Sequence, residues 1–188
     1  MKQLSLIPSA PDTWETSDDW ETPNDLARRI AGMVKPRDRF IIEPSAGTGQ
    51  IAQYLPPGAW CFESNSCRCS IGAENYGQHQ WHMCDFLEVT NDDLPGIGYA
   101  DLIIGNPPFS LWTEFLAHAL GLIHGGGRVI FLGPCDQFHK PNELKKLAKW
   151  KDRIQAIPHP IVGRVAYLKD GIQVSGRQVY DSIFEVTI

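Results

Sequence analysis

Short apolar runs that alternate with helical patterns are the feature that most constrains the fold of this 188-residue chain. The runs lie at residues 39–42, 59–63, 79–84, 101–104 and 128–132. Helical patterns lie at residues 50–55, 67–76, 111–123 and 142–150. Because strands that alternate with helices form parallel sheets with helices on both faces, the order predicts a doubly wound, mostly parallel α/β sheet.

The two ends of the chain depart from this alternation. Residues 1–19 show no hydrophobic periodicity, and we expect a flexible leader there, followed by a single domain over residues 20–188. Asn24 is expected to cap a helix that ends at Lys35-Pro36. Strand-like runs at 154–157, 162–168 and 179–186 close the chain. The last two, joined by residues 169–177, predict a C-terminal antiparallel hairpin.

Composition narrows the class of protein further. No apolar stretch approaches the roughly 20 residues that cross a bilayer, and the N-terminus lacks a signal-peptide pattern. We therefore expect a cytoplasmic protein without a membrane partner. The five cysteines are odd in number, which argues against a disulfide framework. Cys67, Cys69 and Cys84, with two nearby histidines, lack the ligand spacing typical of zinc, and we expect no metal.

Charge is unevenly distributed. The chain carries a net charge of −5, but residues 1–105 contain 7 basic and 15 acidic side chains and sum to −8, whereas residues 106–188 contain 10 and 7 and sum to +3. The asymmetry permits a local basic face for a polyanion. Lys145, Lys146, Lys149 and Arg164 are the candidate nucleic-acid contacts, and a merely solvated helix face is the alternative.

The turn after the first strand has the composition of a ligand loop. Gly47 and Gly49 allow close backbone approach and positive φ. A dinucleotide fingerprint would carry a third glycine where Ala52 stands. Glu43 begins the turn, and a carboxylate suits a cationic amino acid group better than a phosphate.

Two further acids end the next two strands. Glu63 can accept hydrogen bonds from both hydroxyls of a ribose. Asp85 can accept from an adenine amino group, and Phe86 can stack on the ring. Any one of these is compatible with an ordinary loop residue. Together, at one edge of a parallel sheet, they predict an adenosyl ligand.

The fourth strand ends in Asn106-Pro107-Pro108-Phe109. Two prolines stiffen the loop and remove two donors, so that the Pro107 carbonyl and the Asn106 side-chain oxygen present two fixed acceptors. Two such acceptors suit an –NH₂ group and stabilise the positive charge that grows when its nitrogen attacks a methyl group. Phe109 could stack on the base that carries the amine. A plain strand-ending turn is the alternative.

With these motifs in place, the chain resembles the amino-methyltransferase branch of the class I S-adenosylmethionine-dependent enzymes, in particular small phage-type adenine-specific DNA methyltransferases. The resemblance runs from about Trp20 to Ile188 and includes the ending around Gly163-Arg164-Val165. It implies a Rossmann-like fold with a seven-stranded sheet. It also implies a catalytic loop at residues 106–109 and S-adenosyl-L-methionine as cofactor. The implied cofactor contacts are Trp20, Thr22, Pro23, Glu43, Ser45, Gly47, Gly49, Glu63, Asp85, Phe86 and Asn106.

The resemblance implies adenine in DNA as substrate, held by base flipping. RNA adenine or guanine amines, the cytosine 4-amino group and a protein glutamine amide stay open as alternatives. The intact Asn106-Pro107-Pro108-Phe109 loop argues against a non-catalytic subunit. Gly133-Pro134-Cys135 resembles the nucleophile loop of carbon-5 cytosine methyltransferases, but it lies one strand too late. No separate target-recognition domain fits within the chain, so target choice is expected to be loose or to depend on a partner subunit.

Overall fold

The computed structural model describes residues 20–96, 98–161, 163–169, 171–173 and 180–188, so the expected leader lies outside the described residues. A seven-stranded sheet forms the centre, in the order β3-β2-β1-β4-β5-β9-β6. All neighbouring pairs are parallel except those that involve β9, which runs antiparallel to β5 and β6. The strands are β1 (Ile41–Glu43), β2 (Trp60–Phe62), β3 (Gln80–His82), β4 (Ala100–Gly105), β5 (Ile123–Pro134), β6 (Gln155–Pro160) and β9 (Asp181–Thr187).

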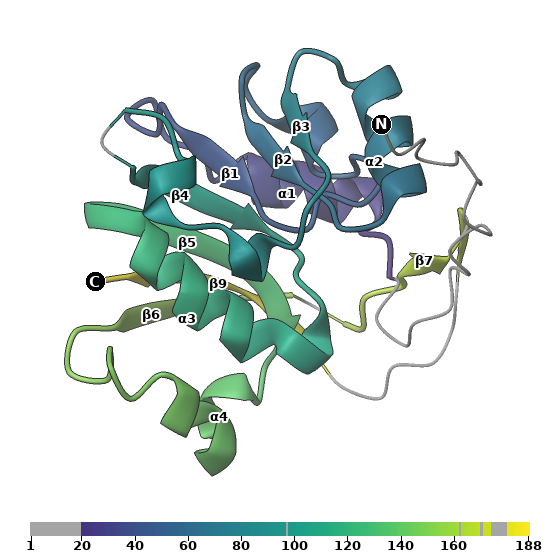
Figure 1. Ribbon diagram of the computed structural model, residues 1–188. Coiled ribbons are helices and arrows are strands. Elements are labelled where there is room, and N and C mark those ends of the chain that lie inside the picture. The colour runs from purple at the N-terminus through teal and green to yellow at the C-terminus, as the bar shows by residue number, and fades with distance from the viewer. Residues whose placement is uncertain (1–19, 97, 162, 170, 174–179) are drawn as a thin grey trace, which may run out of the picture.

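Helices cover both faces of this sheet. In Figure 1, α3 crosses the front and α1 lies behind. A small second sheet, β7 (Leu168–Lys169) with β8 (Ile172–Gln173), stands beside the main one and bridges to Glu21. The α-helices are α1 (Asn24–Ala31), α2 (Ser66–Asn75), α3 (Trp112–Leu122) and α4 (Pro141–Lys146). The doubly wound, mostly parallel sheet with an antiparallel C-terminal pair is thus confirmed.

The core explains why the central strands read as continuous apolar runs. Leu102, Ile103 and Ile104 of β4 and residues 129–132 of β5 are fully buried, as expected where helices cover both faces of a sheet. One charge is also buried here: Arg128 of β5 binds Asp38 and Glu185. Lys35 reaches Glu185 as well, at 3.1 Å. This buried ion network joins the segment before β1 to β5 and β9.

The C-terminal pairing involves different segments from those expected. Besides β5, the strand β9 pairs with β6 at residues 155–160, and the described residues 163–168 do not form the expected arm. The strand β9 lies between β5 and β6 and pairs antiparallel with both. Residue 162, and residues 170 and 174–177 of the expected connection, lie outside the described part of the chain.

Three local expectations were wrong. Asn24 does not cap α1; Pro23 occupies that position, and the Asn24 side chain accepts from Gln53 instead. The expected helix at 50–55 is a single short turn, Ala52–Tyr54. The expected helix at 142–150 ends at Lys146, so the later lysines lie on the turn that follows. In the part of the chain that is described, no helix has the length and apolarity needed to span a membrane.

Candidate functional site

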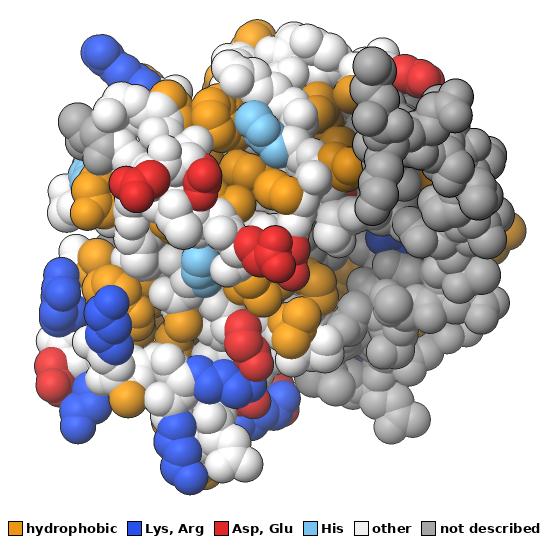
Figure 2. All heavy atoms as spheres, in the orientation of Figure 1, with side chains coloured by type: hydrophobic (Ala, Val, Ile, Leu, Met, Phe, Trp, Pro, Cys, Tyr) orange, Lys and Arg blue, Asp and Glu red, His pale blue; other side chains and the backbone are white. Residues whose placement is uncertain are grey.

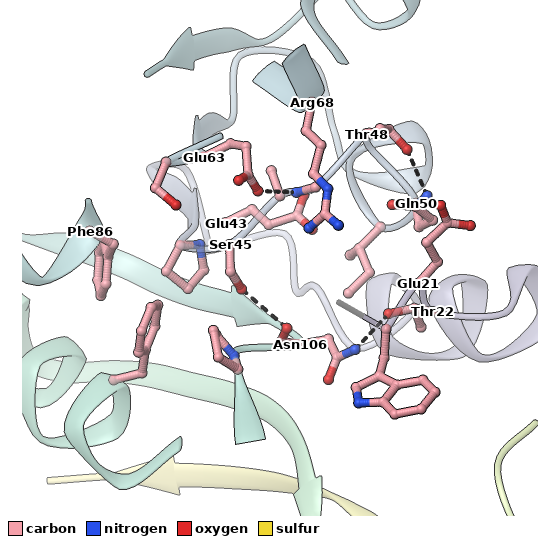
Figure 3. Close-up of a pocket in the computed structure, with 18 of the residues that line it drawn as sticks. Glu21, Thr22, Glu43, Ser45, Thr48, Gln50, Glu63, Arg68, Phe86 and Asn106 are labelled. Carbon is pink, nitrogen blue, oxygen red and sulfur yellow. Dashed lines mark hydrogen bonds between the residues drawn. The ribbon is translucent and has the colours of Figure 1, made fainter. Parts of the chain in front are cut away.

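A cavity of about 330 Å³ opens at the carboxyl ends of β1, β2 and β4, the edge where doubly wound sheets bind ligands (Figure 3). The segment that precedes α1 also contributes residues to the lining of the cavity. Nine of the residues expected to contact a cofactor line it, whereas Pro23 and Gly49 do not. Those nine are Trp20, Thr22, Glu43, Ser45, Gly47, Glu63, Asp85, Phe86 and Asn106.

The turn after β1 is shaped by its glycines. Gly47 and Gly49 have φ of 58° and 101°, values that favour glycine. A Cβ on Gly49 would lie 2.3 Å from the Tyr76 ring, so this glycine serves close packing and not ligand approach. The Gly47 amide donates to Glu63 Oε2 at 2.8 Å, and the Asn65 amide donates to Glu63 Oε1 at 2.8 Å. Two backbone donors therefore fix the Glu63 carboxylate at the cavity wall.

Glu43 is the most deeply buried acid of the site, with 1% of its surface exposed. Its Oε2 is buried without a hydrogen-bond partner among the described residues. Burial, and then the nearby Glu63 carboxylate, raise the pKa of Glu43 well above its ordinary value. A buried carboxylate of this kind is set to gain free energy from a cationic group placed in the cavity.

Asn106 follows β4 and is held from two sides (Figure 3). Its side-chain Nδ2 donates to Thr22 Oγ1 at 3.1 Å, and Ser45 Oγ donates to its backbone oxygen at 3.2 Å. The Asn106 Oδ1 atom is buried without a hydrogen-bond partner in the described chain. The amide is thus oriented by its nitrogen, and its oxygen is left as a fixed acceptor at the cavity.

The third acid, Asp85, follows β3. Asp85 accepts from the Leu87 amide at 2.9 Å and so begins the short helical turn Phe86–Glu88. The Phe86 ring is 1% exposed and packs against Phe115, with ring centroids 5.7 Å apart. Both rings line the cavity, which gives it an apolar wall beside the acids.

Phe109 is placed differently from the other motif residues. Pro108 lines the cavity, but Pro107 and Phe109 do not. Phe109 is 9% exposed, and its ring meets Tyr167 edge-to-face with centroids 5.7 Å apart. Its backbone oxygen accepts from Gln137 Nε2 at 3.4 Å. The two ends of the predicted catalytic loop therefore have different surroundings. Asn106 lines the cavity, whereas the Phe109 ring packs on Tyr167.

Arg68 is the lining residue that the sequence analysis missed most clearly. Its side chain reaches from α2 into a cavity that Glu21, Glu43 and Glu63 also line (Figure 3). Asp85 is a fourth acid of the lining. The signal was available, because Arg68 occupies the first turn of α2, where the helix dipole disfavours a cation. A cation tolerated there indicates acidic surroundings.

The basic residues of the second half gather over α4 and the turn after it (Figure 2). Lys145 and Lys149 are exposed, whereas Lys146 is held by Glu114 and Glu143, each at 2.8 Å. Lys149 lies over the Trp150 ring at 4.9 Å. Arg164 is exposed but lies apart in sequence, after β6.

The cysteines take no part in a metal site within the described residues, where no three His, Cys, Asp or Glu side chains gather to hold an ion. Cys135 is exposed just after β5. Partial desolvation, followed by the carboxylates of Asp181 and Asp136, raises the pKa of its thiol. These surroundings oppose the thiolate that nucleophilic catalysis requires.

Comparison with known proteins gives structural neighbours only. No model of a known protein family matches the sequence, and no curated protein sequence matches it either. Among solved structures, a modification subunit assigned to a type I restriction enzyme of Vibrio vulnificus superposes with a TM-score of 0.65 at 13% identity, over 90% of this chain and 44% of that one. A protein of Listeria monocytogenes assigned as a class I S-adenosylmethionine-dependent methyltransferase gives 0.63 at 16%, over 89% and 61%.

A tRNA methyltransferase of Methanocaldococcus jannaschii is a further neighbour, with a TM-score of 0.60 at 15% identity, over 87% of this chain and 46% of that one. The chain therefore spans about half the length of several neighbours. At sequence identities of 13–16%, the similarity to these structures concerns the fold alone. The chain has the fold of the class I S-adenosylmethionine-dependent methyltransferases.

Proposed function

We propose that the chain transfers a methyl group from S-adenosyl-L-methionine to the 6-amino group of adenine in DNA. One observation carries the proposal most directly: the Asn106 Oδ1 atom is buried at the cavity without a partner in the described chain, while Thr22 fixes the amide through its nitrogen. Leaving a buried acceptor unpaired costs free energy, so such an atom points to a donor that arrives from outside the fold. An amino group is a donor of this kind.

The cavity suits the proposed cofactor. S-adenosylmethionine is cationic at its amino group and at its sulfonium. Four carboxylates and one guanidinium line the cavity among the described residues, so it favours a cationic ligand over a phosphate. We propose that Glu43 binds the amino group, Glu63 the ribose hydroxyls and Asp85 the adenine amine, with Phe86 against the ring. Glu63 keeps free lone pairs while it accepts from Gly47 and Asn65.

The cofactor supplies the electrophilic methyl group, and the chain's residues prepare the amine. The Asn106 Oδ1 atom and the Pro107 carbonyl would accept the two amine hydrogens. An adenine amine is a poor nucleophile because its lone pair is delocalised into the ring. Two fixed acceptors favour a pyramidal nitrogen and stabilise the positive charge that grows on it. Preorganised dipoles aimed at a developing charge are a major source of transition-state stabilisation.

The base would lie on the Phe109 side of the loop, as a flipped nucleotide. Stacking on an aromatic ring contributes roughly 1–3 kcal/mol per base. Phe109 is 9% exposed and rests on Tyr167, so a base that stacks on it has to reach the small exposed part of the ring.

DNA is the proposed polymer because the first structural neighbour is described as part of a restriction enzyme. The exposed Lys145 and Lys149 offer a positive surface, with Lys146 and Arg164 as further candidates. That neighbour is also described as a subunit, which supports a partner subunit for target choice here.

The test is transfer of a labelled methyl group to DNA, RNA and protein offered in parallel. We expect transfer to DNA and an about 10²–10³-fold lower rate for Asn106→Ala, the typical cost of removing one preorganised hydrogen bond. Asn75→Ala, an exposed position at the end of α2, is the matched control. Transfer to RNA or to a glutamine amide instead would replace the substrate. Activity that survives Asn106→Ala and is lost in Cys135→Ala would overturn the mechanism.

A further inference from the structure

Tyr167 lies beneath the loop that holds the proposed catalytic residues. It is 1% exposed, although the segment around it, between β6 and β7, has little regular structure. A large polar ring buried in an irregular segment requires a partner for its hydroxyl. The hydroxyl donates to Asp181 Oδ2 at 2.8 Å, and Asp181 is the first residue of β9 in the main sheet. The sheet therefore anchors the ring.

The anchored ring contacts two other aromatic residues. One is Phe109, edge-to-face with centroids 5.7 Å apart. The other is Trp20, at 6.2 Å. Phe109 comes from the loop after β4, and Trp20 from the segment before α1 that lines the cavity. One side chain thus contacts both the loop after β4 and the segment before α1.

A second connection starts from the neighbouring residue. Leu168 exchanges two backbone hydrogen bonds with Glu21, at 2.9 and 3.1 Å, and the Gly171 amide donates to the Glu21 carboxylate at 3.2 Å. Glu21 precedes Thr22, whose hydroxyl accepts from the Asn106 amide. Residues 167–168 therefore support Phe109 through a ring contact and Asn106 through a strand pairing.

We infer that Tyr167 is a positioning residue, which holds the Asn106–Phe109 loop in the geometry that methyl transfer needs without touching the reacting atoms. The inference rests on the proposed function for its catalytic readout. Its structural part, that Tyr167 fixes Phe109, does not depend on the reaction. A displacement of about 1 Å can cost as much as a hundredfold in rate, so a support of this kind is large enough to measure.

Two substitutions separate the ring from its anchor. Tyr167→Leu removes the ring, and we expect kcat to fall by about ten- to a hundredfold. Affinity for S-adenosylmethionine should fall by less than kcat does, although the ring also contacts Trp20 at the cavity. Such a split between kcat and binding marks a defect in the transition state. Tyr167→Phe keeps the ring contact and loses only the anchor, so its kcat should lie between those of the wild type and Tyr167→Leu. Tyr99→Leu, an exposed tyrosine before β4, is the matched control.

A second measurement does not need activity. With 4-fluorophenylalanine in place of Phe109, the ¹⁹F resonance should be shifted or broadened in Tyr167→Leu and unchanged in Tyr99→Leu. If the wild type transfers no methyl group, the proposed function fails while this measurement still decides the inference. An unchanged resonance in a folded Tyr167→Leu protein would overturn it. Unchanged kcat, or cofactor affinity that falls as much as kcat, would overturn it too.

Discussion

Glu43 is a carboxylate that the fold buries at the proposed cofactor site. Because its pKa is raised in the folded state, the protein should lose stability as pH rises from Glu43's unfolded-state pKa through its higher folded-state pKa. Glu43→Gln should remove this pH-dependent loss of stability. The melting temperature of the variant at neutral pH should therefore equal or exceed that of the wild type. The same variant should bind S-adenosylmethionine more weakly, by calorimetry, because it lacks the charge. Glu74→Gln, exposed on α2, should change neither property.

Asp85 and Glu63 allow a second comparison between single residues. Asp85→Ala removes one proposed polar contact to the cofactor, worth about 1–3 kcal/mol, or roughly tenfold to a hundredfold in affinity. Glu63→Ala should cost more than Asp85→Ala, because Glu63 also accepts from the Gly47 and Asn65 amides and so orders the loop. Asp92→Ala, an exposed acid, is the control. Calorimetry that finds wild-type affinity in both site variants would refute the cofactor assignment.

At the scale of elements, α4 and the turn after it carry the proposed nucleic-acid surface. Reversal of charge in Lys145→Glu with Lys149→Glu should weaken DNA binding for all sequences alike and lower the salt dependence of the affinity, since fewer counterions are released. Arg37→Glu with Arg39→Glu makes the same charge change on two exposed residues of the segment that precedes β1. Equal affinities and salt slopes in the two double variants would return α4 to an ordinary solvated surface.

The central elements were predictable because their apolar runs are buried on both faces. A short apolar run of this kind is compatible with a central strand of the sheet and with little else. The sequence therefore predicted the strands β1 to β5 and the helix α3 close to their observed positions. The glycine turn, the acids after β1, β2 and β3 and Asn106 were predictable for a related reason: all follow parallel strands and therefore meet at one edge.

The C-terminal elements were less predictable because their structure depends on distant partners. The residues of β6 are largely exposed, and their pairing with β9 is decided by the free edge of the sheet and not by a local pattern. Helix α4 ends at Lys146, and Leu147 and Trp150 are buried in the turns that follow it. The Phe109 ring packs against Tyr167, a residue 58 positions later with no motif of its own.

At the scale of the whole molecule, stability depends on an ion network in which Arg128 and Asp38 are buried, Glu185 is mostly buried and Lys35 is exposed. Burial alone would raise the pKa of Glu185, but hydrogen bonds from Arg128 and Lys35 hold it at about 2. Its contribution to stability should therefore be present above the ordinary value of 4.5 and lost as pH falls towards 2. Arg128→Met leaves Asp38 buried without its charged partner and should cost roughly 3–5 kcal/mol in the free energy of unfolding. Chemical denaturation at neutral pH measures it, and a loss below about 1 kcal/mol, typical of exposed ion pairs, would contradict the role of the network.

The central claim is methyl transfer to an exocyclic amine, and the most direct measurement identifies the methylated nucleoside. DNA incubated with the protein and labelled S-adenosylmethionine is digested to nucleosides and analysed by mass spectrometry. We predict methylation of the 6-amino group of adenine in the wild type, reduced to a trace in Asn106→Ala. A methyl group on the 4-amino group of cytosine would keep the mechanism and correct the base. A methyl group on carbon 5 of cytosine, or a product that Asn106→Ala forms as fast as the wild type, would contradict the account.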